Sequence, residues 1–277
     1  MIPRKASDNL PYVVWFIIYF LVFWLITGLH WIGLIILLIV YTISIIFAFS
    51  PAAEILWRTI NGVRPLRIRQ EKLRLLPLFK EVYTEAVNVV PSLSRGIKLY
   101  IKEDMNINAS SFGRKTLVLT RGSLELLDDE CLKGLLIHEL GHFVHYDTVA
   151  VLIASIGNFF MITLMKYLTD LKKVIDEKKK DSIIMGCVKF LYDCIFYIFR
   201  SIQFLCDSVL MHISRKNEYL ADLFAYHCGF GAEMTAVLIE IYNSIISKPQ
   251  SIKELIKSDH PPITKRIEHL EKMLYSD

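Results

Sequence analysis

An uninterrupted apolar stretch dominates the N-terminal part of the chain. Residues 12 to 50 contain no Asp, Glu, Lys or Arg, so 39 consecutive positions are uncharged. One bilayer crossing needs about 20 apolar residues, and the stretch is therefore long enough for two. Gly28 and His30 lie near its middle, where a turn at headgroup level fits best. We predict a transmembrane hairpin, Tyr12 to about Ile26 and about Ile32 to Phe49, in preference to one bent span.

A second pair of apolar segments lies in the middle of the chain. Val149 to Leu168 carries only Lys166 as a charged residue, and Ile183 to Phe199 carries Lys189 and Asp193 four positions apart. In a membrane helix such a pair must neutralise itself or face protein. Two arrangements are open: the two segments span the bilayer, or they form a hairpin that enters it only in part. We predict a mainly α integral membrane protein with about four transmembrane helices.

The remaining parts of the chain have the patterns of an α+β domain. Ile97 to Lys102 alternates apolar and polar residues, as a half-buried strand does, and Thr116 to Thr120 is predicted to be a second strand. Asp128 is a suitable N-cap for a helix with acidic residues in its first turn. A further helical pattern runs from Ser201 to His227 and ends before Gly229.

The placement of positive charge predicts an orientation. The net charge is +4; Arg4 and Lys5 precede the hairpin, and a basic cluster follows it: Arg58, Arg64, Arg67, Arg69, Lys72 and Arg74. Positive flanks stay on the cytoplasmic side, so both ends of the hairpin are expected there. Because no nucleic-acid-binding motif is present, we expect the basic cluster to contact anionic lipid rather than nucleic acid. The lysine-rich connector at residues 169–182 conflicts with this rule if four spans are present.

Composition narrows the class of protein further. The hydrophobic fraction is 53%, above the usual range of soluble proteins. The first apolar run is too long for a signal peptide and no clean cleavage site follows it, which favours a retained anchor. The five cysteines are odd in number and none forms a C-x-x-C pair, so we expect buried free thiols.

His138-Glu139-Leu140-Gly141-His142 is the most informative stretch of the sequence. Residues four apart share a face of a helix, so the two imidazoles can bind one metal ion with a carboxylate beside them. This is the zinc-metalloprotease pattern HExxH. His145 lies too far along the helix axis to be the third ligand. The three-histidine pattern also fails, because it requires Gly where His145 stands and His where Thr148 stands.

A glutamate from a second helix is the other common third ligand. Glu218 and Asp222 are four apart and share one helix face. One of them can bind the metal while the other holds the free nitrogen of a ligand histidine. The alternative is that both acids cap or solvate the helix, and the presence of HExxH favours the metal site.

Four blocks of the sequence resemble one family: Asn108-Ala109 with Phe112 to Lys115, His138 to His142 with Asp147, Arg215 to Asp222, and His260-Pro261-Pro262 with Arg266-Ile267. On these blocks the chain resembles the HtpX family of membrane zinc metalloproteases, which are related to the CAAX prenyl proteases. The resemblance covers roughly residues 70 to 277, whereas the N-terminal hairpin matches by hydropathy only. The chain departs from the family at Ser110 and Ser111, where the family carries Ala or another apolar residue.

The resemblance implies an α+β zincin-type metalloprotease domain. One zinc ion is then held by His138, His142 and Glu218, with Asp147 and Asp222 supporting the ligand histidines. The implied organisation is an N-terminal transmembrane hairpin at 1–51 and the third and fourth membrane segments at 149–200. The two halves of the catalytic domain are 52–148, with an edge strand and the HExxH helix, and 201–277, with the glutamate ligand.

The resemblance also implies a mechanism. Glu139 acts as the general base in peptide hydrolysis, and His260 or Arg266 donates a hydrogen bond to the developing oxyanion. For His260 and Arg266 the alternative is a surface turn and a charged helix face. The edge strand and its approach are expected to hold the extended substrate, with these residues: Asn108, Ala109, Leu117, Val118 and Leu119.

The expected function is endopeptidase cleavage of membrane or misfolded polypeptides at the cytoplasmic face of a cell membrane, in protein quality control. Abundant Ile and Lys suit a prokaryote. Two alternatives remain: a CAAX-type processing protease, and a non-catalytic membrane scaffold with a structural zinc. The scaffold needs a fourth protein ligand, and the sequence offers no good candidate for it apart from His145 or His260. A transporter is disfavoured because over half of the chain has an extramembrane pattern.

Overall fold

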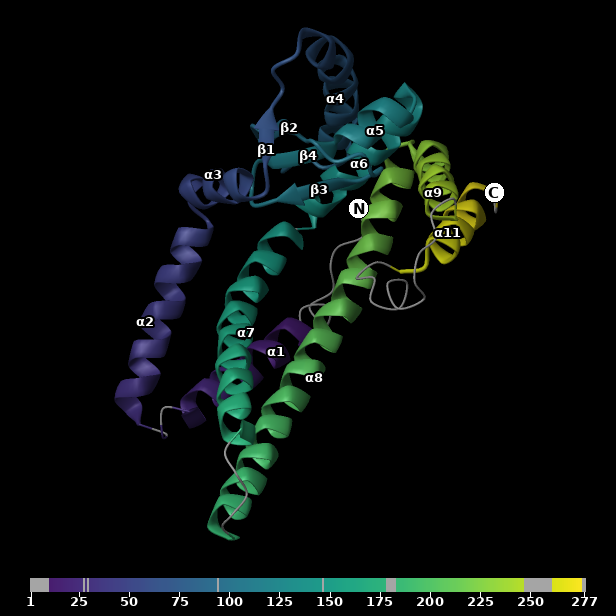
Figure 1. Ribbon diagram of the computed structural model, residues 1–277. Coiled ribbons are helices and arrows are strands. Elements are labelled where there is room, and N and C mark those ends of the chain that lie inside the picture. Colours follow the sequence, from purple (N-terminus) through teal and green to yellow (C-terminus); the bar gives the residue numbers. More distant parts are fainter. Residues whose placement is uncertain are drawn as a thin grey trace. The chain divides into compact units, whose positions relative to one another are not determined.

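The computed structural model describes residues 10–26, 28, 30–93, 95–145, 147–177, 183–246 and 261–275, and most of these are helical (Figure 1). The chain forms two compact units. The first contains Ile45–Leu152 and Ile213–Asp277, and the second contains Ala6–Ser44 and Ile153–His212. The prediction of a mainly helical protein is therefore confirmed.

Long apolar helices make up the second unit. Helix α1 (Leu10–Ile26) and most of α2 (Trp31–Ala48) coincide with the predicted N-terminal hairpin. Helices α7 (Asp147–Glu177) and α8 (Ile183–His227) contain the two later apolar segments. The buried cluster of this unit comes from α1, α7 and α8: Trp15, Val22, Met165, Leu168 and Phe196.

One helix in the described part of the chain, α2, is long and apolar enough to cross a membrane. Helix α1 has 17 residues, begins two residues before the predicted first span and ends with it at Ile26. The structure thus supports one of the four predicted spans directly, and the other three stay predictions.

Lys189 and Asp193 of α8 do not neutralise each other. Lys189 forms an ion pair of 2.5 Å with Asp176 of α7, and Asp193 forms one of 2.6 Å with Lys172 of α7. The ammonium of Lys172 also lies 4.9 Å from the ring centroid of Phe196. Lys189 and Asp193 therefore do not pair with each other: each of them pairs with a charged residue of the neighbouring helix α7.

A four-stranded sheet lies in the first unit. Its strands are β1 (Val63–Pro65), β2 (Lys98–Lys102), β3 (Ala109–Phe112) and β4 (Thr116–Thr120), in the order β1-β2-β4-β3. Strands β2 and β4 run parallel, and both outer strands run antiparallel to their neighbours. Strands β2 and β4 were predicted from the sequence, β2 from the alternation of its residues, whereas β1 and β3 were not predicted.

The edge strand is not the predicted one. Leu117, Val118 and Leu119 were expected to offer a strand edge to the substrate, and this prediction is wrong. They belong to β4, which pairs with β2 on one side and with β3 on the other, and all five of its residues are buried. The outer strand next to it is β3, in the polar segment that precedes β4.

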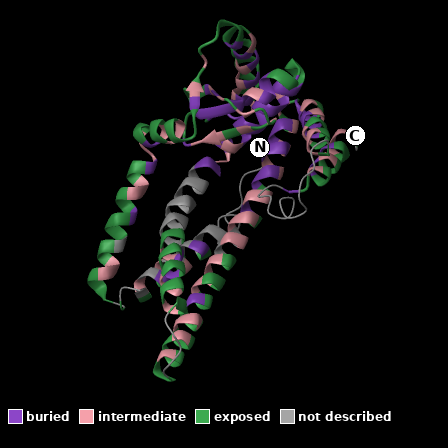
Figure 2. Ribbon diagram, viewed as in Figure 1, coloured by how far each residue is buried: buried purple, intermediate pink, exposed green. Residues whose placement is uncertain are grey.

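The first unit also contains the end of α8 from Ile213 and six further helices: α3 (Pro51–Ile60), α4 (Arg69–Val89), α5 (Arg121–Leu126), α6 (Asp129–Val144), α9 (Gly231–Ile246) and α11 (Ile263–Tyr275). Figure 2 shows the buried residues gathered in the sheet and in the helices packed on it. Helix α6 packs against α4, α9 and β3 and is buried over most of its length. It therefore forms the centre of the core.

Helix α3 fixes the turn between β3 and β4. Glu54 accepts hydrogen bonds from the backbone N–H of Arg114 at 2.7 Å and from the hydroxyl of Thr116 at 2.8 Å. Trp57 stacks on Phe112 of β3 with ring centroids 4.2 Å apart. Strand β3 is thus held at one end by side chains of α3.

Candidate metal centre

Helix α6 places two histidines on one face, as the sequence predicted. Its N-terminus is capped by Asp128, whose carboxylate accepts a hydrogen bond of 2.7 Å from the N–H of Cys131. Ten and fourteen residues further on, His138 and His142 present rings whose centroids are 4.9 Å apart. A defined helix start and four-residue spacing therefore position both imidazoles.

Glu218 of α8 completes the cluster. Its Oε2 lies 3.4 Å from Nε2 of His138, and its Oε1 lies 3.7 Å from Nε2 of His142. One ligand atom from each of the three residues lies within 4.8 Å of the others. The structure thus brings together the three side chains that the sequence proposed, although 75 residues lie between His142 and Glu218 in the chain.

The other nitrogen of each histidine faces a carboxylate. Nδ1 of His138 lies 2.9 Å from Oδ1 of Asp222, and Nδ1 of His142 lies 3.2 Å from Oδ2 of Asp147. Carboxylates in these positions favour the tautomer with hydrogen on Nδ1, which leaves the Nε2 lone pair toward Glu218. Asp222 and Asp147 therefore lie beside the ligand histidines, as predicted.

Burial and these carboxylates act in opposite directions on the pKa of each histidine. Burial favours the neutral form of His138, but hydrogen bonds to Asp222 and Glu218 outweigh it and raise the pKa to about 9. Burial also opposes protonation of His142, and Asp147 raises its pKa on balance. The carboxylates around the two imidazoles thus favour a positive charge at this cluster.

Arg266 of α11 contacts the carboxylates of Asp222 and Glu218. Its Nε and Nη2 donate hydrogen bonds of 2.8 and 2.7 Å to the two oxygens of Asp222, and its Nη1 lies 2.8 Å from Oε2 of Glu218. Burial opposes ionisation of Asp222, but Arg266 outweighs it and keeps the pKa of that carboxyl below its usual value. The predicted role of Arg266 as an oxyanion donor does not match this geometry, because the buried guanidinium is occupied by these two carboxylates.

These residues fit a divalent metal ion. Two imidazole nitrogens and one carboxylate oxygen point at a common position, and each imidazole has its second nitrogen on a carboxylate. Such a set leaves further coordination positions for water or substrate, as catalytic sites require. His260, the other predicted oxyanion donor, lies outside the described residues.

Comparison with known proteins agrees with this geometry. The profile of Peptidase family M48 matches residues 83–274, which is more than half of the chain. The chain belongs to this family. It is 29% identical to a protease HtpX homolog of Dictyoglomus turgidum over 97% of this chain and 93% of that protein. It is 27% identical to a protease HtpX homolog of Bacteroides fragilis over 82% and 76% of the two chains.

A solved structure has the same fold. The crystal structure of S. mikatae Ste24p superimposes with a TM-score of 0.51 at 19% identity, covering 95% of this chain and 63% of that one. Together with the family match, these relatives indicate that the chain is a metalloendopeptidase of the M48 family. The bacterial relatives support a prokaryotic origin.

Within this M48 site, Glu139 faces strand β3. The hydroxyl of Ser111 lies 2.6 Å from Oε2 of Glu139 and 2.9 Å from its backbone oxygen. Asn108 and Ala109 lie at the start of the same strand, and the N–H of Ala109 donates to Oδ1 of Asn108 at 2.9 Å. Of the two residues predicted to approach the substrate, Ala109 therefore belongs to the strand that contacts Glu139, and Asn108 directly precedes it.

Two residues of the site escaped the sequence analysis. Ser111 was noted only as a departure from the family pattern; strand alternation, which puts it on the same side as Ala109, is the signal that could have found it. Gly141 occupies one of the two unspecified positions of HExxH, to which that pattern assigns no role. A Cβ atom there would lie 3.0 Å from the Cα of Ala221, so α6 and α8 approach closely beside the ligands.

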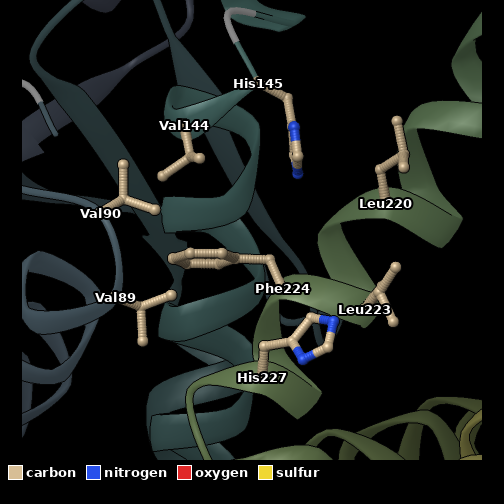
Figure 3. A pocket seen from close by; sticks show the side chains of 8 residues that line it. All are labelled: Val89, Val90, Val144, His145, Leu220, Leu223, Phe224 and His227. Atoms are coloured by element: carbon tan, nitrogen blue, oxygen red, sulfur yellow. The ribbon is translucent and has the colours of Figure 1, made fainter. Parts of the chain in front are cut away.

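His145 belongs to a different part of the unit. It follows the last residue of α6, and its ring makes an edge contact with Phe224 at a centroid distance of 6.5 Å. It lines an apolar pocket that Figure 3 shows, together with Val89, Val90, Val144, Leu220, Leu223, Phe224 and His227. The pocket contains none of the three clustered ligands, in agreement with the prediction that His145 is not the third one.

Proposed function

We propose that the chain is a zinc-dependent endopeptidase that cleaves membrane or misfolded polypeptides at the cytoplasmic face of a prokaryotic cell membrane. The observation that carries the proposal is the convergence of His138, His142 and Glu218, with Glu139 between the two histidines. Two neutral imidazoles and one carboxylate form the His₂Glu donor set of catalytic zinc in metalloproteases. A zinc ion held there would supply Lewis-acid activation of water and of the scissile carbonyl.

The protein's own residues perform the remaining steps. Glu139 takes the proton from the attacking water and passes it to the leaving amine, so that its carboxylate is restored at the end of the cycle. Strand β3 offers backbone N–H and C=O groups to an extended substrate, which binds as an additional strand. Asp222 and Asp147 keep the imidazoles oriented, and Arg266 holds Asp222.

Proximity of the site to an apolar helix supports a membrane-linked substrate. Asp147, which contacts His142, is the first residue of α7, and the apolar stretch from Val149 begins two residues later. The Glu218 helix is likewise continuous with the apolar segment from Ile183. A multi-pass arrangement with both ends of each hairpin inside puts the two halves of the site on the cytoplasmic side.

The general base is tested with Glu139→Gln. This variant keeps the ligands and is expected to bind zinc at the wild-type ratio, while its turnover falls by about 10² to 10⁴-fold. Zinc content is measured on purified protein by atomic spectroscopy, and cleavage of an unfolded membrane protein is measured in detergent before and after chelation. Turnover of Glu139→Gln at the wild-type rate would show that Glu139 is not the base.

The substrate class needs a separate comparison. Initial rates on an unfolded membrane protein, an unfolded soluble protein and a prenylated peptide are measured side by side. We expect the first to be cleaved fastest. Equal rates on the first two would refute the membrane preference, and preferential cleavage of the prenylated peptide would support the CAAX-type alternative. The chain spans 63% of the length of the Ste24p chain that it superimposes on, so activity of that whole protein is not transferred to it.

A further inference from the structure

The hydroxyl of Ser111 contacts the carboxylate that we propose as general base. Its Oγ lies 2.6 Å from Oε2 of Glu139, a short distance typical of a hydroxyl that donates to a carboxylate. The same oxygen lies 2.9 Å from the backbone oxygen of Glu139. Glu139 is 5% exposed and Ser111 is half-buried, so water competes little for this contact.

The sheet determines where this hydroxyl points. Ser111 pairs with the buried Leu117 of β4 in an antiparallel register. Successive side chains of a strand point to opposite faces. Phe112, the next residue, stacks on Trp57 of α3, whereas Ser111 contacts Glu139 of α6. The position of Ser111 is therefore set by backbone pairing and by α3, independently of Glu139.

A glutamate side chain has three rotatable bonds, and without a partner its carboxylate samples several rotamers. A hydroxyl can form a hydrogen bond with Glu139 in both of its protonation states. It donates a hydrogen bond to the carboxylate and accepts one from the carboxylic acid. In the second case its own proton goes to the backbone oxygen of Glu139, which is within reach. Ser111 thus offers a partner at every stage of the proton transfer.

We propose that Ser111 is a positioning residue that holds the Glu139 carboxylate in the geometry required for proton transfer. The proposal rests on the proposed role of Glu139 as general base. Because Ser111 belongs to β3, it also fixes the base relative to the strand that binds the substrate. Loss of the hydroxyl leaves the backbone of β3 and the three metal-binding side chains in place, so it slows the chemical step without weakening substrate binding.

The test uses the full chain loaded with zinc and an unfolded polypeptide substrate. Ser111→Ala is expected to lower kcat by about 10- to 100-fold, as a misplaced catalytic group does, with KM within about twofold of the wild-type value. Ser111→Thr, which keeps a hydroxyl on a strand-compatible side chain, is expected to retain most of the activity. The matched control is Ser244→Ala on α9, which removes a hydroxyl that donates to the backbone oxygen of Ile241 at 3.0 Å.

Zinc content of each variant provides a readout besides activity, and it is expected to be the same as in the wild type. An unchanged kcat in Ser111→Ala, or a rise in KM alone, would overturn the proposal. So would a loss of zinc that accounts for the loss of rate. Glu139→Gln separates the two roles: activity of this variant would show that Glu139 is not the base, whereas activity of Ser111→Ala alone would show that Ser111 does not position Glu139.

A double-mutant cycle shows whether Ser111 acts through Glu139. Glu139→Asp shortens the side chain by one methylene and withdraws the carboxylate from the hydroxyl. If the two residues act as a unit, Ser111→Ala lowers kcat much less in the Glu139→Asp background than in the wild type. Equal losses in both backgrounds would show that Ser111 acts independently of Glu139 and would contradict the proposal.

Discussion

Gly141 lies against Ala221 at the point where α6 and α8 touch. A Cβ atom on Gly141 would lie 3.0 Å from the Cα and 3.2 Å from the Cβ of Ala221, closer than nearly all real contacts of this kind. Gly141 directly precedes His142, and Ala221 is three residues after Glu218. The absence of a side chain inside HExxH therefore lets the second helix bring Glu218 to the histidines.

Gly141→Ala is expected to separate the two helices. Overpacking of this kind costs about 1–3 kcal/mol, which exceeds the gain in helix propensity of about 1 kcal/mol. We expect a lower thermal unfolding midpoint and weaker zinc binding, measured in detergent by fluorescence and by competition with a chelator. Gly186→Ala on α8 is the control, since no atom lies within 4 Å of its added Cβ. Unchanged zinc affinity in Gly141→Ala would show that the contact does not position Glu218.

Asp222→Asn is expected to weaken zinc binding about 10- to 100-fold. The asparagine has the same size but lacks the charge that orients His138 through its Nδ1 at 2.9 Å. Chelator competition on the purified variant measures the affinity. Glu268→Gln, which removes an exposed carboxylate of α11 that pairs with Lys272, should bind zinc as the wild type does. Equal affinities of both variants would mean that Asp222 does not support the ligand.

Arg266→Met is expected to destabilise the metal-free protein by about 3–5 kcal/mol, because two buried carboxylates lose their common partner. Arg266→Lys should rescue little, since an ammonium cannot reproduce the two-point contact with Asp222. The thermal unfolding midpoints of Arg266→Met and Arg266→Lys measure these losses of stability. Lys265→Met, at the exposed neighbouring position, is the control. If Arg266→Met has the wild-type unfolding midpoint and only its kcat falls, Arg266 acts as the oxyanion donor and not as the partner that stabilises the two carboxylates.

Cys131 is expected to resist alkylation in the folded protein. Burial and the nearby Asp128 raise the pKa of its thiol from 9.0 to about 12, so the reactive thiolate is scarce at pH 8. The folded state binds this proton more tightly than the unfolded state, and its stabilising effect is lost as the pH rises above 9. Mass spectrometry after treatment with N-ethylmaleimide should find Cys131 modified in denaturant only. Rapid modification under native conditions would contradict the buried position.

Helical spacing explains which residues of the site could be predicted from the sequence. HExxH and the Glu218–Asp222 pair follow from the four-residue repeat of a helix, which places side chains on one face whatever the rest of the protein does. Asp128 likewise predicted the start of α6 from its capping chemistry alone. These features depend on residues within one or two turns of each other, and the fold did not alter them.

The sequence by itself therefore determined the chemistry of this protein: which side chains can bind a metal, which can accept a proton, and which segments are apolar. Only the tertiary structure decided which groups meet. The sheet order made β3 the outer strand in place of β4, α11 brought Arg266 to Asp222, and Ser111 reached Glu139. The physical reason is that each of these contacts joins segments distant in the chain, so it depends on strand register and helix packing that no local pattern encodes.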